Sequence, residues 1–194
     1  VIDRTVIFYD QFGCGKSSRP SNAKEEPFSI PLMVQHLKLL LTKQWGLSKY
    51  HLLGHSFGGI LAYEYLVSCS DLERMACQSL ILASAPTSAD LIQQESRRLY
   101  RLVNSLIDDH DDTLDDVAAR HLHAENFRQT HECRLAQPPL ALIDAMAQAG
   151  PTPWKGIPAI LGYEAKQSLS HVPTLLLRGE YDFCTEQCMA GWYD

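Results

Sequence analysis

Short apolar runs alternate along the chain with longer stretches in which apolar residues recur at helical spacing. The runs at residues 5–9, 50–53, 79–83 and 174–177 are compact and rich in aliphatic, β-branched or aromatic side chains, which predicts strands. A helix is predicted over residues 31–46, because a proline opens it and its apolar residues lie three and four positions apart. Strands separated by helices predict a parallel sheet with helices on its faces. We therefore expect an α/β fold.

The pattern changes after residue 86. Residues 87–149 carry amphipathic helical patterns and no convincing strand, and a turn-rich stretch follows them. The acidic cluster "DDHDDTLDD" in this region is typical of a solvated helix end. A helical insertion between two segments of a sheet is typical of a lid or cap over an active-site face. The expected organisation is a first part of the core, a helical cap and a second part of the core, over residues 1–86, 87–170 and 171–194.

Composition and charge narrow the possible partners. The 194 residues are 45% hydrophobic, which suffices for one sizeable core with a smaller appendage. The net charge is −6 and no run of lysines and arginines occurs, so no nucleic-acid partner is expected. No apolar stretch is long enough to span a bilayer, and the first residues resemble a strand more than a signal peptide. We expect a cytoplasmic protein without a membrane partner, and its oligomeric state stays open.

The six cysteines and the histidines do not indicate a metal site. The cysteines are scattered, without the close spacing of metal ligands, and are most simply reduced thiols. His121 and His123 are two positions apart on a predicted helix and do not share a face. We expect neither a metal nor another cofactor.

The stretch "YHLLGHSFGGILAYEY", residues 50–65, places a serine between glycines where the strand pattern gives way to a helical one. A sharp strand-to-helix turn has no room for large side chains, and Gly54 and Gly58 flank Ser56 on both sides. The pattern Gly-x-Ser-x-Gly in this context is typical of the nucleophile elbow of α/β-hydrolases. It predicts a positive φ at Ser56, a nucleophilic hydroxyl there, and a backbone N–H of Phe57 directed at an oxyanion. A glycine-rich turn with an incidental serine is the alternative interpretation.

A candidate acid follows the last apolar run. In "VPTLLLRGEYD" a buried strand over 174–177 leads through a turn at Gly179 to Asp182. In this architecture the acid follows the nucleophile in chain order, on a loop after a later strand, and it orients the catalytic histidine. We expect Ser56 and Asp182 at the carboxyl edge of neighbouring parallel strands, with room for one imidazole between them.

The chain offers no suitable histidine after this aspartate. The last one, His171, precedes Asp182, and His55 cannot serve because adjacent side chains at the elbow diverge. We expect the base beyond residue 194 and the second oxyanion donor before residue 1. The chain would then be an interior fragment, or an incompletely built gene, of a longer hydrolase and inactive by itself.

Several segments together resemble the proline iminopeptidases, or prolyl aminopeptidases, of the α/β-hydrolase superfamily. "VIFYDQFGCGKSSRP" is similar to the family's loop after an early strand, "HLLGHSFGGILAYEY" to its elbow and "VPTLLLRGEYD" to its acid strand. In the cap, "HECRLAQPP" resembles a weaker family pattern. The resemblance implies that Ser56 is the nucleophile, that Asp182 is the acid, and that the substrate is a peptide or amide with a free N-terminal residue.

Two departures from the family concern the substrate's ammonium group. The family commonly has a glutamate directly after the acid, where this chain has Phe183, and an Asn-Glu-Phe segment where this chain has Thr152-Pro153-Trp154. We expect Trp154, Phe183 and Glu180 at the substrate-binding site, and Glu164 and Glu186 are further candidates to replace the absent carboxylates.

The sequence thus predicts a serine hydrolase that cleaves an amide or peptide bond through an acyl-enzyme. An amino-acid amidase, an esterase or a lactonase on the same fold is the alternative enzyme, and its substrate would be a small amide or ester. Epoxide hydrolases and haloalkane dehalogenases carry an aspartate at the elbow, so Ser56 argues against them. A degenerate hydrolase that acts as a binding module is the alternative outside catalysis.

Overall fold

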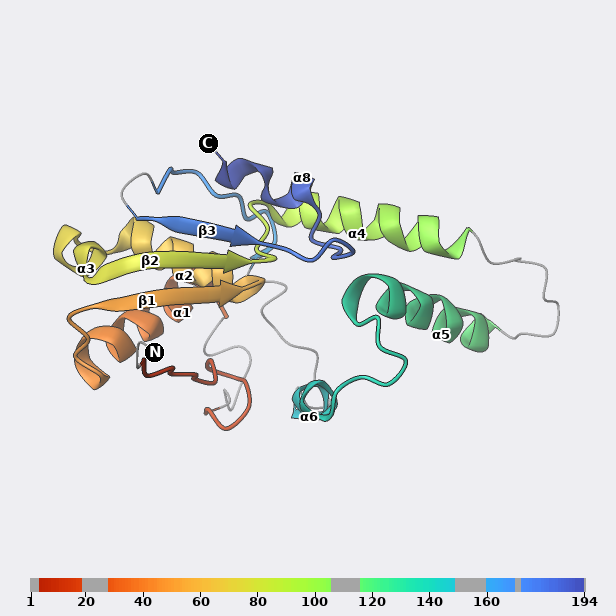
Figure 1. Ribbon diagram of the computed structural model, residues 1–194, viewed down its shortest axis with the longest axis horizontal. Helices are drawn as coiled ribbons and strands as arrows, with labels where there is room; N and C mark the ends of the chain where they lie inside the picture. Colours follow the sequence, from red (N-terminus) through yellow and green to blue (C-terminus); the bar gives the residue numbers. More distant parts are fainter. Residues whose placement is uncertain (1–3, 19–27, 106–115, 149–159, 170–171, 194) are drawn as a thin grey trace.

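The sheet lies on the left in Figure 1, and its strands point toward a group of helices on the right. The structure is a computed structural model that describes residues 4–18, 28–105, 116–148, 160–169 and 172–193. Within them the sheet has three strands in the order β1-β2-β3, all parallel. These strands are β1 (Tyr50–His55), β2 (Cys77–Ala83) and β3 (Thr174–Leu177).

Helices connect and flank the strands. Among the described residues, a helix precedes β1, two helices link β1 to β2, three helical segments follow β2, and a short helix follows β3. Their bounds are α1 (Ile30–Leu39) with the π-helical turn η1 (Leu40–Gln44), α2 (Phe57–Ser68), α3 (Asp71–Ala76), α4 (Ala89–Asn104), α5 (Asp116–Phe127) with the π-helical turn η2 (Arg128–Glu132), α6 (Leu140–Gln148), α8 (Glu186–Met189) and the 3₁₀ turn η3 (Ala190–Trp192).

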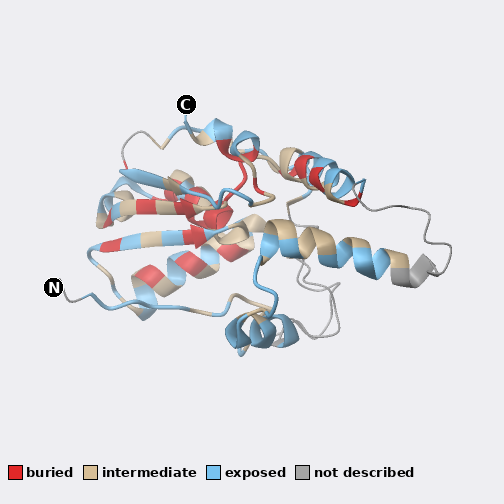
Figure 2. Ribbon diagram, turned by 45° about the vertical axis from the view of Figure 1, so that its right-hand side comes forward, coloured by how far each residue is buried: buried red, intermediate tan, exposed pale blue. Residues whose placement is uncertain are grey.

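The main core lies between α1, α2 and one face of the sheet. Side chains alternate across a strand, so Leu80 and Leu82 of β2 point into this layer and are buried, together with Leu66 of α2. Helix α2 is buried on most sides, because the sheet covers one side of it and α1 another (Figure 2). Its Tyr63 ring also contacts Trp192, with ring centroids 4.7 Å apart.

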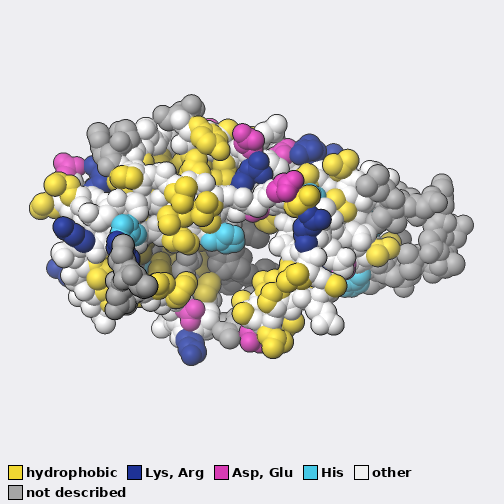
Figure 3. All heavy atoms as spheres, viewed as in Figure 1, with side chains coloured by type: hydrophobic (Ala, Val, Ile, Leu, Met, Phe, Trp, Pro, Cys, Tyr) yellow, Lys and Arg dark blue, Asp and Glu magenta, His cyan; other side chains and the backbone are white. Residues whose placement is uncertain are grey.

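The other face of the sheet remains uncovered in the part of the chain that the structure describes. Leu53 and Leu175 occupy one row of the sheet, because both pair with Ile81, and they are 64% and 52% exposed. Leu177, two residues further along β3, is 45% exposed, so the expectation that the strand over 174–177 is buried is wrong. Figure 3 shows apolar side chains gathered over the strands on this side.

The strand expected over residues 5–9 is wrong. Residues 4–10 lie outside the strands, and the side chains of Val6 and Phe8 are 71% and 90% exposed. The segment is held instead by a 2.8 Å contact between Arg4 Nη1 and His51 Nε2 and by an edge-on contact of Tyr9 with Trp45. A β-branched run forms a strand only when a neighbouring strand satisfies its backbone groups, and none of the described strands pairs with this one.

Helices α4, α5 and α6 lie beyond the carboxyl ends of the strands (Figure 1). Helix α4 packs on α5 through the rings of Tyr100 and Phe127, whose centroids are 5.9 Å apart. The amide of Asn104 donates to the carbonyl oxygen of His123 at 3.3 Å, which ties the end of α4 to the middle of α5. The described residues between 87 and 149 therefore form a helical layer at the edge of the sheet where β1, β2 and β3 end.

Candidate active site

Ser56 stands at a strained turn between β1 and α2. Its backbone has φ 51° and ψ −120°, a positive φ that L-residues rarely adopt and that its sequence pattern predicts. The Ser56 N–H donates to the carbonyl oxygen of Ala83 at 2.9 Å, so pairing with β2 continues one residue past the strand. The Ser56 carbonyl oxygen then accepts from the N–H of Gly59 at 2.9 Å and starts the helix.

The glycines around Ser56 allow the strand and the helix to touch. A Cβ on Gly54 would lie 2.3 Å from the carbonyl oxygen of Gly58, and one on Gly59 would lie 2.4 Å from the Cβ of Ala85. Gly58 differs, because a Cβ there would meet nothing within 4 Å. Close packing therefore requires Gly54 and Gly59, whereas the glycine at position 58 leaves open space beside Ser56.

Phe57 directly follows Ser56 and is the first residue of α2, a helix of twelve residues. Backbone N–H groups in the first turn of a helix point away from the helix body and, together with the helix dipole, favour negative charge. The backbone of Phe57 is thus part of the helix end that adjoins the Ser56 hydroxyl. Its service as an oxyanion donor stays a prediction.

Asp182 lies on the loop after β3, which we call the acid loop and define as residues 178–184. Its carboxylate has a partner on each oxygen: Oδ1 accepts from the backbone N–H of Cys184 at 2.8 Å, and Oδ2 accepts from the hydroxyl of Ser84. A carboxylate offers about four acceptor positions, so capacity remains for a histidine N–H.

The expected placement of Ser56 and Asp182 on neighbouring strands is wrong. The sheet order puts β2 between β1 and β3, so the two residues follow strands that are two apart, at the same carboxyl edge. Strands two apart are separated by about 10 Å. The gap is wider than expected because the run over 77–83 pairs with both β1 and β3.

Ser84 is a site residue that the sequence interpretation missed. It directly follows β2, has φ 48°, and donates its backbone N–H to the carbonyl oxygen of Leu177 at 2.7 Å. Its hydroxyl reaches Asp182, 98 positions away in the chain. A serine directly after a buried strand, as in the elbow itself, was the pattern that could have indicated it.

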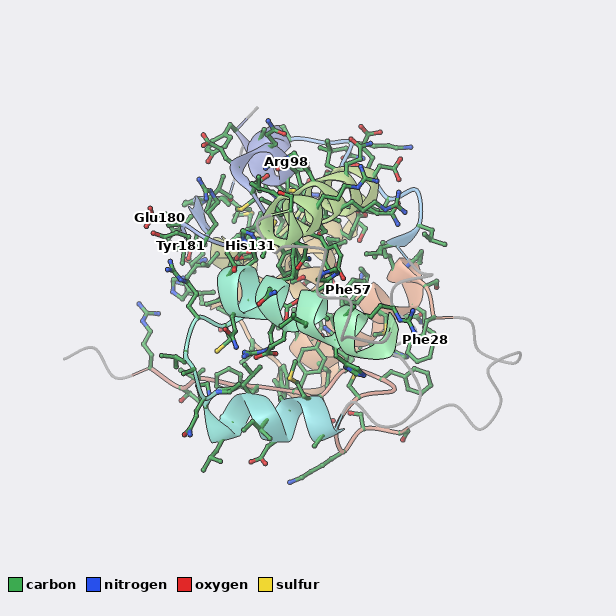
Figure 4. The ribbon with its side chains drawn as sticks, turned by 90° about the vertical axis from the view of Figure 1, so that its right-hand side faces the viewer. Phe28, Phe57, Arg98, His131, Glu180 and Tyr181 are labelled. Atoms are coloured by element: carbon green, nitrogen blue, oxygen red, sulfur yellow. The ribbon has the colours of Figure 1, made fainter. Side chains whose placement is uncertain are left out.

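His131 was also missed as a neighbour of the acid loop. Its Nδ1 lies 2.7 Å from the carbonyl oxygen of Tyr181, and since a carbonyl only accepts, Nδ1 carries the proton. The other ring nitrogen, Nε2, is buried without a hydrogen-bond partner among the described residues. Figure 4, viewed from the end to which the strands point, labels His131 between Tyr181 and Phe57. The "HECR" stretch was singled out in the sequence, but only as a weak resemblance.

Two further contacts join the helical layer to the acid loop. The rings of Phe127 and Phe183 have centroids 6.1 Å apart, and the guanidinium of Arg134 lies 3.6 Å from the ring centre of Tyr181. Phe183 is therefore half-buried against α5.

The other residues expected at the substrate-binding site lie on exposed segments or outside the described residues. Glu180 is exposed and lies at the margin of the view in Figure 4, away from Phe57. Trp154 and the segment 152–154 lie outside the described residues. Glu164 is exposed and pairs through its backbone with Ser88, and Glu186 faces Arg178 at 3.6 Å.

Glu95 of α4 is a buried carboxylate close to this edge. Arg98 holds it with two hydrogen bonds of 2.8 and 2.9 Å, and the hydroxyl of Thr185 donates to it at 3.0 Å. The hydrogen bonds from Arg98 lower the pKa of Glu95 despite its burial. The Thr185 hydroxyl also lies 3.6 Å from the buried sulfur of Cys188, and hydrogen bonding to Cys184 lowers the pKa of Cys188 to about 7.

No group of three or more histidine, cysteine or acidic side chains in the described ranges is arranged to hold a metal ion. In those same ranges, no helix combines the length and the apolar composition that a membrane span requires.

A parallel sheet with a strained serine turn between strand and helix, and a carboxylate at the same edge, defines an α/β-hydrolase. In agreement, the family described as alpha/beta hydrolase fold matches residues 2–187. The proline iminopeptidase of Lactobacillus delbrueckii subsp. bulgaricus is 33% identical over 208 residues, which cover 98% of this chain and 69% of that protein. The enzyme of Lactobacillus acidophilus is also 33% identical, over 99% of this chain and 69% of its own length. The chain belongs to the proline iminopeptidase family, as the sequence resemblance predicted.

Solved structures agree on the fold. The proline iminopeptidase of Mycobacterium smegmatis matches with a TM-score of 0.71 at 22% identity, over 94% of this chain and 65% of that one. VinJ matches with a TM-score of 0.70 at 23% identity, over 96% of this chain and 68% of that one. The predicted α/β-hydrolase fold is thus confirmed.

Proposed function

We propose that the protein is a serine hydrolase that releases the N-terminal residue of a small peptide or amide through an acyl-enzyme. The observation that carries this proposal is the strained backbone of Ser56, which holds a hydroxyl at the start of α2 on the sheet edge that also carries Asp182. Backbone strain of this kind clusters at functional sites, because it costs free energy and persists only where the surrounding structure holds it.

The proposed reaction assigns roles to Ser56, Phe57 and Asp182, which act together with a histidine. The Ser56 hydroxyl attacks the carbonyl carbon while a histidine that follows Asp182 in chain order takes its proton, and the same histidine then protonates the departing amine. The backbone N–H of Phe57 stabilises the oxyanion at the start of α2. Asp182, already held by Ser84 and Cys184, fixes the tautomer of the histidine and stabilises the imidazolium. Water releases the acyl group by the reverse proton transfers.

We assign residues 87–170 to a cap over this edge. The position of α4, α5 and α6 beyond the strand ends supports the assignment (Figure 1). The contacts of Phe127, His131 and Arg134 with the acid loop support it further, because they seat the helical layer directly beside Asp182.

The names of the relatives support a substrate with an N-terminal proline or a similar residue. Phe183 favours a second candidate, an amidase or esterase that accepts substrates without a free amine. Its ring packs on Phe127 and adds apolar surface where the family commonly has a carboxylate for the ammonium group.

The test uses the protein expressed from its complete gene. We expect hydrolysis of proline p-nitroanilide, and labelling of Ser56 by a fluorophosphonate probe. Ser56→Ala should abolish both, whereas Ser68→Ala at the far end of α2 should leave both unchanged. Hydrolysis of p-nitrophenyl esters with no turnover of proline p-nitroanilide would favour the esterase. Labelling and hydrolysis both absent from the intact protein would contradict the proposal and favour a binding module.

A further inference from the structure

Ser56 and Ser84 occupy equivalent places on adjacent strands. Each is the first residue after its strand, each has a positive φ (51° and 48°), and each donates its backbone N–H to the last residue of the next strand, at 2.9 and 2.7 Å. They are the two non-glycine residues with positive φ in the described part of the chain. Ser84 therefore stands between the elbow that follows β1 and the acid loop that follows β3.

A glycine would suit the backbone at position 84 better than a serine does, because positive φ is strained for any residue with a Cβ. What serine adds is a hydroxyl, and that hydroxyl donates to Oδ2 of Asp182. The N–H of Cys184 engages the other oxygen at 2.8 Å, so the carboxylate is held from two sides and cannot rotate without breaking one of the bonds.

We propose that Ser84 is a positioning residue that holds the Asp182 carboxylate in the orientation needed to receive the catalytic histidine. The inference rests on the proposed function, in which Asp182 orients that histidine. Ser84 acts through Asp182 and touches neither substrate nor the reacting atoms. Its backbone ties it to β3 and its side chain ties it to the acid loop, so it fixes the distance between the strand end and the carboxylate.

The test compares Ser84→Ala with Ser84→Gly in the complete protein. Alanine removes the hydroxyl and keeps the strained Cβ, whereas glycine removes both, so an effect shared by the two variants belongs to the hydroxyl. Ser70→Ala is the matched control. Ser70 caps α3 at the opposite end of the sheet, and its loss weakens the fold without reaching the acid loop.

Two measurements are needed, one catalytic and one independent of catalysis. With proline p-nitroanilide, both Ser84 variants should lower kcat about tenfold or more, because Asp182 loses a hydrogen bond to its charged carboxylate. KM should stay unchanged, because Ser84 does not contact the substrate. By amide hydrogen exchange, the Cys184 N–H should exchange about tenfold faster in both variants, since its carboxylate partner is free to turn. Ser70→Ala should change neither quantity.

The outcomes separate this inference from the proposed function. An unchanged kcat or an unchanged exchange rate at Cys184 in an otherwise active protein would overturn the role of Ser84 and leave the proposed function standing. If unmodified protein hydrolyses no substrate, the proposed function fails by itself. The exchange rate then still decides whether Ser84 holds Asp182, and an unchanged rate overturns the inference.

Discussion

The imidazole Nδ1 of His131 lies 2.7 Å from the carbonyl oxygen of Tyr181, so the helical layer is hydrogen-bonded to the residue that precedes Asp182. Movement of the helical layer would therefore either break this hydrogen bond or carry the acid loop with it. This contact joins residues 50 positions apart in the chain and lies beside those of Phe127 with Phe183 and of Arg134 with Tyr181.

Replacement of His131 by phenylalanine should loosen this attachment. His131→Phe keeps an aromatic ring beside Phe127, whose centroid is now 5.3 Å from the imidazole, but removes the hydrogen bond to Tyr181. We expect a loss of about 1 kcal/mol in the free energy of unfolding, measured by urea denaturation. His121→Phe, at an exposed position of α5, is the control and should change the stability little. Equal stability of the two variants would contradict the attachment.

The elbow glycines provide a matched pair. Gly54→Ala should destabilise the protein by about 2 kcal/mol or more, because the new Cβ would lie 2.3 Å from the carbonyl oxygen of Gly58. Gly58→Ala should be neutral or stabilise by about 0.5 kcal/mol, since a Cβ there meets nothing and alanine favours the helix. Urea denaturation of the two variants checks the contrast, and a larger loss at position 58 would show that the packing of β1 on α2 is misjudged.

Glu95 should contribute an acid-sensitive part of the stability. Its pKa in the folded protein is lowered below the ordinary 4.5, chiefly by the hydrogen bonds from Arg98. The contribution is therefore fully present above pH 4.5 and is lost as the pH falls through the lower folded value. Glu95→Gln keeps the shape and should be about 1 kcal/mol less stable than the unmodified protein at pH 7. The difference should shrink as the pH is lowered below 4.5, and a difference independent of pH would show that the charge of Glu95 is unimportant.

Phe183→Glu should sharpen the preference for a free N-terminus. The aromatic ring offers an ammonium group at most a cation–π contact of about 0.5–2 kcal/mol, whereas a charge-assisted hydrogen bond to a carboxylate is roughly twice as strong as a neutral one. The unmodified enzyme should discriminate weakly between free-amine and N-acetylated substrates. The ratio of kcat/KM between the two should rise in the variant. Strong rejection of N-acetylated substrates by the unmodified enzyme would instead indicate another carboxylate, with Glu164 and Glu180 as the first to replace.

The sequence by itself determined the local parts of this protein. The strand, turn and helix around Ser56 follow from apolar periodicity and from glycines that permit close packing, and these depend on residues within about ten positions of one another. The strand over 174–177 and the turn before Asp182 were predictable for the same reason. The family followed from three such segments.

The tertiary structure decided which of these segments meet. The apolar run over residues 5–9 has strand propensity but pairs with none of the described strands. Whether a run finds a partner strand cannot be predicted from the residues of the run alone. The insertion of β2 between β1 and β3 set the gap between Ser56 and Asp182. Only the folded chain brings the hydroxyl of Ser84 to Asp182, 98 residues away, because hydrogen bonds between distant segments depend on strand order and register, which periodicity does not encode.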